Sequence, residues 1–284
     1  MKFSYNLRDK FLFFLSYLFY KFIVPLEVKR PRTKMFIYEM IYSFYKLIDY
    51  KKNFPYFFND NLIVTKFGKF KIRSKTADAA SVSPAYERRD VNFLIKKIDE
   101  KIKENKKILF CDIGADIGYY SILIGNKFKR KIKIFSFEPL KESFELLKEN
   151  ININNLSDTI VPLNFALSDS EGEFYINVNI LSPGDSSLIY SFDNGVKIKV
   201  KTKRLDDILG DYVREFDTVL AKIDVEGFEE KVLTGAKRFL ENSKEVILLI
   251  EDFINPEIIN YLEKNNFKFL CKLTTYNSFW TYKL

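Results

Sequence analysis

The sequence contains no histidine and only two cysteines among its 284 residues. Without histidine there is no Ser-His-Asp triad and no histidine-ligated metal, so acid–base chemistry falls to carboxylates, lysine or tyrosine. The cysteines, Cys111 and Cys271, lie in apolar stretches. They do not suggest the disulfide framework of a small secreted domain, and the default location is therefore a reducing cytoplasm.

The sequence also lacks an uninterrupted apolar run long enough to span a bilayer. The most hydrophobic run, residues 11–25, contains Lys21 and ends at Pro25, whereas a spanning helix needs about 20 apolar residues. No small-residue cleavage site of a signal peptide follows it. Three interpretations stay open: a helix packed on the domain, a peripheral helix on a membrane surface, which would make the protein membrane-associated, or an oligomer contact.

The charge of the chain is unevenly distributed. Residues 1–110 carry 24 basic and 11 acidic side chains, a net charge of +13, whereas the remainder carries 22 and 27, a net charge of −5. A basic front half suits a partner with phosphates, an anionic membrane surface or an acidic glycan. The alternative is a lysine-rich surface of the kind found in some thermophile proteins.

Two short regions precede the main domain. Residues 1–52 have the pattern of two aromatic-rich helices, so we assign residues 1–60 to an N-terminal helical segment and residues 61–284 to one catalytic domain. Alternating apolar and polar residues over 61–74 predict a β-hairpin. Helical spacing of apolar residues predicts a helix over 85–104.

From Lys107 onward, apolar strands alternate with helical patterns. This rhythm predicts an α/β fold, a doubly wound seven-stranded and mostly parallel sheet with helices on both faces. The last two strands, near 267–273 and 278–284, are joined by a short loop and must form an antiparallel edge hairpin. Pro139 is predicted at the first position of a helix, and residues 228–240 are predicted to form a single helix.

Two of the ten glycines follow the first strand of this alternation. Asp112, Gly114 and Gly118 form a D-x-G-x-x-x-G pattern, which differs from the G-x-G-x-x-G of nicotinamide and flavin binders. The next strand ends in Glu138, whose carboxylate can accept hydrogen bonds from both hydroxyls of a ribose. The favoured ligand therefore has a ribose, no pyrophosphate and a positive charge facing Asp112, as S-adenosylmethionine does. The alternative is a tight structural turn followed by an incidental acid.

Residues 64–255 resemble the FkbM family of S-adenosylmethionine-dependent methyltransferases. The resemblance is carried by an ordered set of segments, FGKFKIR, YERRD, DIGADIGYYS, FEP, NFALSDSEGE, DSSL, RLDDIL and KIDVEGFEEKVLTGA. It implies a Rossmann-like methyltransferase fold, S-adenosylmethionine as cofactor and a small-molecule or saccharide acceptor. Two departures stand out: Asp116 replaces the usual asparagine, and no histidine follows Glu251.

The glycine turn and this resemblance together imply a set of cofactor-binding residues. The set comprises Asp112, Gly114, Ala115, Gly118 and Tyr119 in the first turn, Glu138 and Pro139 after the second strand, and Ala166 and Asp169 after the third. Asp169 is expected to accept a hydrogen bond from the adenine amine. Glu87, with Asp78 upstream of it, either folds over the cofactor or caps the 85–104 helix.

The candidate catalytic residues lie at the end of the fourth strand. Lys222, Asp224 and Glu226 are two residues apart, so on a strand they share one face. A hydroxyl acceptor needs its proton removed, and with no histidine one of these three residues must serve as the base. We assign no metal. The alternative left open is a divalent cation such as Mg²⁺, held by Asp224, Glu226 and Glu251, that acidifies the hydroxyl.

The leading hypothesis is an O-methyltransferase acting on a hydroxyl of a sugar, a glycan or a related metabolite. Hydroxyls in the loop 182–187 are candidates for lining the acceptor pocket. One alternative is a membrane-surface or assembly component that keeps the fold without activity. A methyltransferase acting on nucleic acid is the other, and it has only the basic front half in its favour.

Overall fold

The structure is a computed structural model that describes residues 62–73, 78–82, 87–178, 184, 186, 195–252 and 255–283. The chain divides into two units, residues 1–86 and 87–284, which are described separately. The predicted helices before residue 60 and the apolar run 11–25 lie outside the described residues. The domain boundary expected at residue 60 therefore stays a prediction.

The described part of the first unit is a hairpin followed by a short helix. Strands β1 (Leu62–Thr65) and β2 (Gly68–Lys71) pair in antiparallel register, which confirms the predicted hairpin. Helix α3 spans Asp78–Ser81. Asp78 accepts hydrogen bonds from the main-chain N–H of Arg73 at 2.8 Å and from its Nε at 2.9 Å, so this carboxylate is occupied by a buried ion pair.

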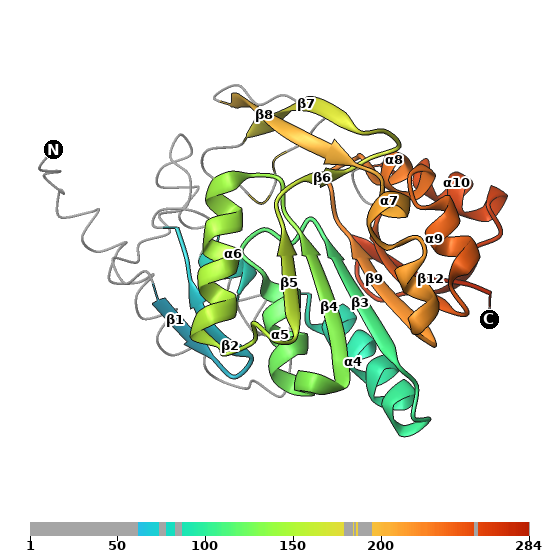
Figure 1. The fold of residues 1–284 in the computed structure, drawn as a ribbon, viewed down its shortest axis with the longest axis horizontal. Coiled ribbons are helices and arrows are strands. Elements are labelled where there is room, and N and C mark those ends of the chain that lie inside the picture. Colours follow the sequence, from blue (N-terminus) through green and yellow to red (C-terminus); the bar gives the residue numbers. More distant parts are fainter. Residues whose placement is uncertain are drawn as a thin grey trace, which may run out of the picture. The chain divides into compact units, whose positions relative to one another are not determined.

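A seven-stranded sheet forms the centre of the second unit (Figure 1). Its strands are β3 (Ile108–Ile113), β4 (Ile132–Phe137), β5 (Ile160–Leu163), β9 (Thr218–Ile223), β10 (Val246–Glu251), β11 (Lys268–Lys272) and β12 (Asn277–Tyr282). The order is β11-β12-β10-β9-β3-β4-β5; β12 pairs antiparallel with β10 and β11, and the other pairs are parallel. The predicted doubly wound sheet with a reversed edge hairpin is confirmed.

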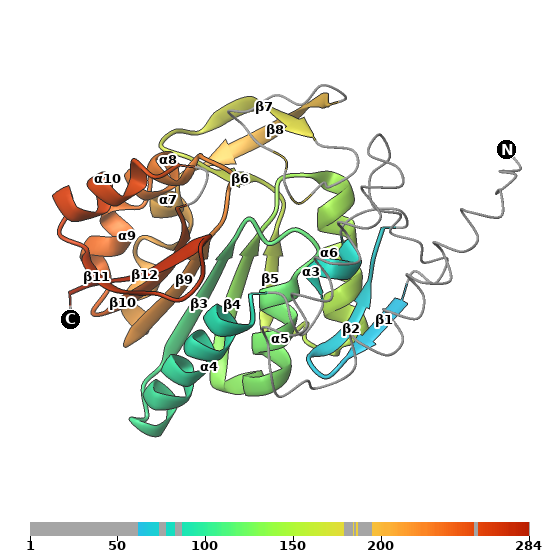
Figure 2. The ribbon, with the colours of Figure 1, turned by 180° about the vertical axis from the view of Figure 1, so that it is seen from behind.

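Helices cover both faces of this sheet. They are α4 (Arg88–Lys103), α5 (Tyr119–Phe128), α6 (Lys141–Ile153), α7 (Leu205–Leu209), α8 (Glu229–Thr234), α9 (Lys237–Asn242) and α10 (Ile258–Lys264), with short 3₁₀ turns η2 (Lys129–Lys131) and η4 (Tyr212–Glu215). Helices α7 to α10 pack on one face in a shared apolar core that includes Leu109, Cys111 and Ile113 of β3. Figure 2 shows α4 and α5 on the opposite face.

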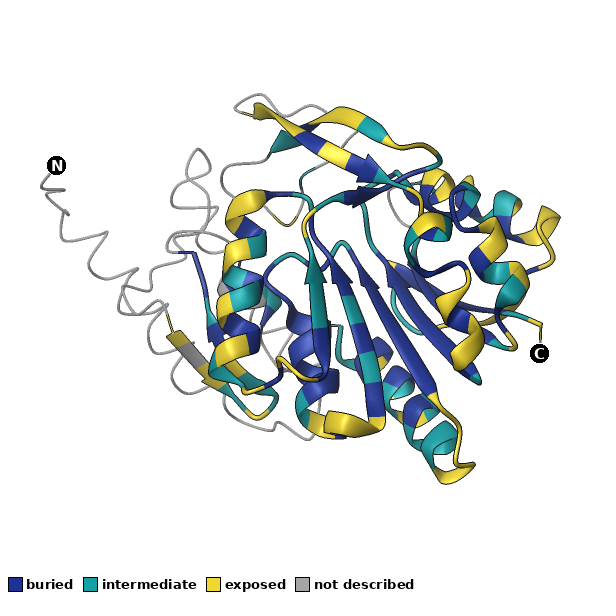
Figure 3. Cartoon of the chain, in the orientation of Figure 1, coloured by how far each residue is buried: buried dark blue, intermediate teal, exposed yellow. Residues whose placement is uncertain are grey.

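Burial on both faces explains why the central strands lack a polar side. Every residue of β3 and β9 is buried (Figure 3), because side chains that alternate along a strand meet helices in both directions. Asp112 and Lys222 are therefore polar groups placed inside the core, directly opposite one another in the β3–β9 register. Such groups need partners, since burial of an unpaired charge is unfavourable.

A second, three-stranded sheet lies beyond the carboxyl ends of the central strands (Figure 1). It is formed by β6 (Ala166–Leu167), β8 (Val196–Lys203) and β7 (Gly172–Val178) in that order. Ile176 and Val200 are buried together with Leu140 and Ala166 in a small apolar cluster. This sheet therefore provides apolar side chains close to the mouth of the large sheet.

Two local predictions are wrong. Helix α6 begins at Lys141, so Pro139 precedes the helix; the Glu138 carboxylate accepts the Leu140 N–H and keeps Leu140 extended. The single helix predicted over 228–240 is broken into α8 and α9. Asp206 explains the break: its N–H donates to the Gly235 carbonyl, and its side chain accepts the N–H of Phe239.

Among the residues that the structure describes, no helix combines the length and apolar character needed to cross a bilayer.

Candidate active site

The turn between β3 and α5 brings two glycines into left-handed backbone conformations. Gly114 has φ +81° and Gly118 has φ +91°. A Cβ on Gly114 would lie 1.8 Å from the Asp224 carbonyl oxygen, and one on Gly118 would lie 2.5 Å from Cδ1 of Leu147. Both glycines are thus required by backbone conformation and close packing. The close approach at Gly114 also places the loop after β9 directly beside this turn.

Glu138 faces the same turn from the end of β4. Its Oε2 accepts the N–H of Asp116 at 2.9 Å and its Oε1 accepts the N–H of Leu140 at 2.8 Å. The amide of Asn164 donates to the main-chain carbonyls of Glu138 and Pro139, which fixes the backbone on either side of the peptide bond. The carboxylate is buried and rigidly oriented toward the first turn.

A pocket opens at this point, at the carboxyl ends of the strands. Its lining residues are Ile113, Gly114, Asp116, residues 137–140, residues 165–167, Ile176, Gly184, Ser186, residues 224–226 and Phe228. The lining combines apolar side chains, among them Phe165, Leu167 and Ile176, with several carboxylates. A mostly apolar lining with a few polar groups is typical of small-molecule sites.

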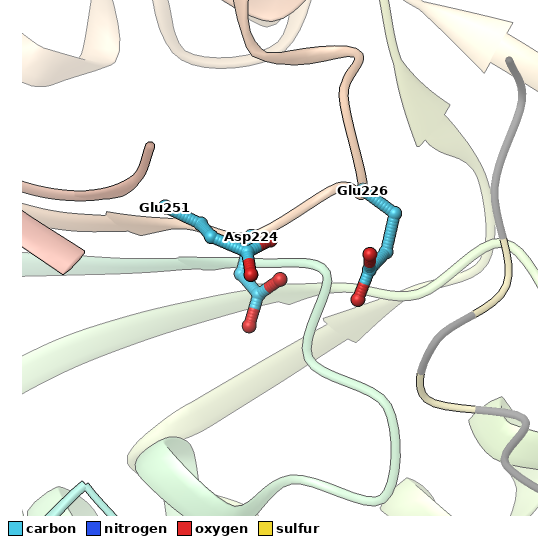
Figure 4. Close-up of side chains that lie close together, drawn as sticks. All are labelled: Asp224, Glu226 and Glu251. Carbon is cyan, nitrogen blue, oxygen red and sulfur yellow. The ribbon is translucent and has the colours of Figure 1, made fainter. Parts of the chain in front are cut away.

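Three carboxylates, those of Asp224, Glu226 and Glu251, lie close together (Figure 4), and the first two line the pocket. Glu251 ends β10, whereas Asp224 and Glu226 follow β9, which ends at Ile223. Glu226 has φ +53° in the turn, so the strand alternation predicted from Lys222 through Glu226 stops before Glu226. The turn nevertheless brings one oxygen of each carboxylate within 4.8 Å of the other two. The predicted acidic set is therefore assembled, by a turn and not by a strand face.

Glu251 is the protonated member of this cluster at neutral pH. Burial raises its pKa well above the ordinary value, and the charges of Asp224 and Glu226 raise it further. With its pKa raised to about 10, Glu251 carries a proton at neutral pH. Asp224 then faces the pocket beside a neutral carboxylic acid.

Lys222 is a buried ammonium paired with Asp224. Its Nζ lies 2.7 Å from Oδ2 of Asp224 and 4.9 Å from the centre of the Tyr120 ring. Burial alone would lower the pKa of Lys222, but the carboxylates of Asp224, Glu87 and Asp112 outweigh burial and raise it. Lys222 therefore holds its proton at any physiological pH.

Asp112 is fully buried beneath the turn and holds the start of α5. Its Oδ2 accepts the N–H of Ser121 at 3.0 Å and the Ser121 hydroxyl, which in turn contacts the Ser136 hydroxyl at 2.6 Å. Burial raises the pKa of Asp112, and the charge of Lys222 opposes that shift. The cation that Asp112 faces within the protein is thus Lys222, opposite it on β9.

The sequence that forms this site matches a known protein family. The family model described as the methyltransferase FkbM domain matches residues 112–269, more than half of the chain. The chain belongs to the FkbM methyltransferase family. The match begins at the buried Asp112 and ends within β11, so it spans the glycine turn, Glu138 and the acidic cluster.

Individual relatives are distant. Methyltransferase sdnD of Sordaria araneosa is 28% identical, over 55% of this chain and 72% of that protein. Hexuronic acid methyltransferase AglP of Haloferax volcanii is 28% identical, over 60% of this chain and 66% of that protein. The crystal structure of methyltransferase FkbM from Methylobacillus flagellatus has 17% identity and a TM-score of 0.43, over 62% of this chain and 43% of that chain.

The pocket of this FkbM methyltransferase contains only part of the predicted cofactor set. Gly114, Glu138, Pro139 and Ala166 line it, as do Asp224 and Glu226 of the predicted catalytic set. Of the described residues predicted to bind the cofactor, the following lie outside the lining: Asp112, Ala115, Gly118, Tyr119, Asp169 and Glu87.

Asp169 and Glu87 are among the outlying residues that have other partners. Asp169 accepts a hydrogen bond from Nζ of Lys231 at 2.6 Å. Glu87 is bonded to Tyr120 and Asn277. From the loop 182–187 only Gly184 and Ser186 are described, and both line the pocket. A direct cofactor role for the outlying residues stays a prediction.

Several residues of the FkbM site were not predicted. Phe165 and Phe228 line the pocket; both lie inside segments that carry the family resemblance, but neither was assigned a role. Glu229 is buried at the start of α8, where its Oε1 accepts the N–H of Gly227 at 2.9 Å and so stabilises the turn that carries Glu226. The sequence did contain a signal for this role, because Glu229 follows Gly227 by two residues at the start of a predicted helix, where an acidic side chain can accept a main-chain N–H.

Proposed function

We propose that this chain is an S-adenosylmethionine-dependent O-methyltransferase that methylates a hydroxyl of a sugar, a glycan or a related metabolite. One observation supports this above the others: Glu138 and Asp224 line the same pocket. The first is a carboxylate suited to a ribose, and the second is a carboxylate suited to accept a proton. A cofactor held by one and an acceptor held by the other would meet inside one cavity.

The residues around Glu138 fit the cofactor. Each carboxylate oxygen accepts a main-chain N–H, which fixes the carboxylate in the orientation in which it would accept hydrogen bonds from ribose hydroxyls. The apolar side chains of Phe165 and Leu167 provide a wall for an adenine ring. S-adenosylmethionine, when bound, supplies a methyl group on a positively charged sulfur.

Asp224 is the proposed base. It lines the pocket and has the Lys222 ammonium 2.7 Å away, which orients the carboxylate while leaving it able to take the proton of an acceptor hydroxyl. Lys222 keeps its own proton and therefore acts by charge and position. Glu226 also lines the pocket, two residues after Asp224. We propose that it binds a second hydroxyl of the acceptor.

The carboxylates of Asp224 and Glu226 in the pocket lining favour a neutral acceptor. A carboxylate acceptor would meet Asp224 and Glu226 at close range, and like charges at short distances disfavour binding. A sugar hydroxyl is uncharged and offers a donor to each carboxylate. We therefore propose an ether product in preference to an ester, although one relative is a hexuronic acid methyltransferase.

The test is methyl transfer from isotope-labelled S-adenosylmethionine to a panel of methyl glycosides and free glucuronic acid, read by mass spectrometry. The expected product is a methylated glycoside that survives mild alkali, as ethers do. A product that mild alkali hydrolyses would be a methyl ester, and the acceptor would then be a carboxylate and not a hydroxyl. Failure of the protein to bind S-adenosylhomocysteine by calorimetry would refute the proposal.

The other functions expected from sequence stay predictions. The membrane-surface alternative rests on the N-terminal run 11–25, outside the described residues, and the nucleic-acid alternative rests only on the basic front half. A cytoplasmic location, oligomer formation and a divalent metal on the acidic cluster are likewise untested.

A further inference from the structure

Glu87 occupies an unusual position immediately before α4. It has φ +41° and ψ +31°, the left-handed conformation that few residues other than glycine adopt. Its two carboxylate oxygens are both occupied: Oε2 accepts the Tyr120 hydroxyl at 2.7 Å, and Oε1 accepts the Asn277 amide at 2.8 Å. A strained backbone is retained where the surrounding contacts determine it, often at a functional site.

Tyr120 connects Glu87 to the proposed catalytic pair. Its side chain is buried, and its hydroxyl is fixed by Glu87 while its ring lies under the Lys222 ammonium, 4.9 Å from ring centre to Nζ. A ring in this position attracts the cation. The ammonium is thus bounded by the Tyr120 ring on one side and by the Asp224 carboxylate, at 2.7 Å, on another.

The start of strand β12 holds Glu87 in place. Asn277, the first residue of β12, also donates to Oδ2 of Asp90 at 3.1 Å, and Asp90 accepts the Thr274 hydroxyl at 2.8 Å. Asp90 and Asn277 are buried. The hydrogen bonds thus join the start of α4 to the turn between β11 and β12, on the side where Glu87 meets Tyr120.

We propose that Glu87 is a positioning residue that fixes Lys222, through Tyr120, so that the ammonium orients Asp224 for proton transfer. This inference rests on the proposed function, and it extends it by naming a residue outside the pocket lining. It also replaces the expected role of Glu87 as a cover over the cofactor. Burial raises the pKa of Glu87, and the Lys222 charge and the two donated hydrogen bonds oppose that shift.

The first test measures the coupling between Glu87 and Lys222 without any substrate. Glu87→Gln should lower Tm in the wild-type background, because Lys222 loses a compensating charge. In a Lys222→Met background the same change should raise Tm, because Glu87 is then a buried carboxylate with no cation. The control is Glu100→Gln. Glu100 lies near the other end of α4 and pairs with surface lysines, so its replacement should shift Tm equally in both backgrounds. Equal shifts for Glu87→Gln in both backgrounds would overturn the inference.

The second test separates positioning from cofactor binding. With the methyl glycoside that reacts fastest in the panel above, Glu87→Gln and Tyr120→Phe should each lower kcat about tenfold or more. The Kd for S-adenosylhomocysteine and the KM for S-adenosylmethionine should change less than about twofold. A tenfold rise in Kd with kcat unchanged would make Glu87 a cofactor contact and overturn the inference, as would no change in either.

These two tests fail independently. If the wild-type protein binds no S-adenosylhomocysteine, the proposed function is wrong, while the reversal of the Tm shift still decides whether Glu87 holds Lys222. If binding and transfer are found but the Tm shifts are additive, the proposed function stands and the positioning role is wrong.

Discussion

Replacing Gly114 with alanine should damage the site and the fold together. The new Cβ would lie 1.8 Å from the Asp224 carbonyl oxygen, so the backbone must open by more than about an ångström to reach the 3.0 Å that real contacts respect. Overpacking of this kind costs about 1–3 kcal/mol, and the left-handed backbone adds about 1 kcal/mol for a residue with a Cβ. We expect a loss of roughly 2–4 kcal/mol and a fall in Tm on the order of 10 °C.

The matched control is Gly172→Ala at the start of β7. There a Cβ would meet nothing closer than 3.9 Å, so Tm should stay within about 2 °C of wild type. Calorimetry gives both Tm values and the affinity for S-adenosylhomocysteine, which Gly114→Ala should weaken at least about tenfold because the displaced turn itself lines the pocket. Equal Tm values for the two variants would refute the steric reasoning.

Three further predictions concern single groups of the site. Glu138→Ala should raise the Kd for S-adenosylhomocysteine at least about tenfold, whereas Glu142→Ala, exposed on α6, should leave it unchanged; equal Kd values would remove Glu138 from the site. Because the folded state raises the pKa of Glu251, stability should fall by up to about 1.4 kcal/mol per pH unit as pH rises between the ordinary and the raised pKa. Glu251→Gln should abolish that fall, so the Tm of the variant minus the Tm of the wild type should increase from about pH 5 to about pH 8.5. A Tm difference that does not change with pH would contradict a protonated Glu251. EDTA should leave methyl transfer intact, because the Lys222 ammonium and the Glu251 proton already balance Asp224; a loss restored by Mg²⁺ would instead assign a metal.

The parts of the fold that could be predicted depend on local patterns. The strands β3 and β9 are apolar runs covered on both faces, and their length and spacing are visible without any tertiary contact. The carboxyl ends of parallel strands meet at one edge of a sheet. The nearness of Glu138, Asp224 and the glycine turn therefore follows from the order of the strands.

The parts that could not be predicted depend on contacts between distant residues. Asp169 pairs with Lys231 and Glu87 pairs with Asn277, 62 and 190 positions away, and neither sequence neighbourhood indicates the partner. Glu226 shows the same limit at short range. The hydrogen bond from the N–H of Asp224 to the Ile113 carbonyl continues the ladder by one residue, after which the backbone turns.

The position of β12 has a consequence for the order in which the protein is assembled. This strand follows the other six in the sequence, yet it lies between β10 and β11. A ribosome makes the chain from its amino end, so β11 emerges before β12, the strand with which it pairs among the described residues. The place between β10 and β11 is filled only once residues 277–282 have been made. Asn277 belongs to that strand, so its hydrogen bonds to Glu87 and Asp90 can form only after the other six strands of the sheet exist.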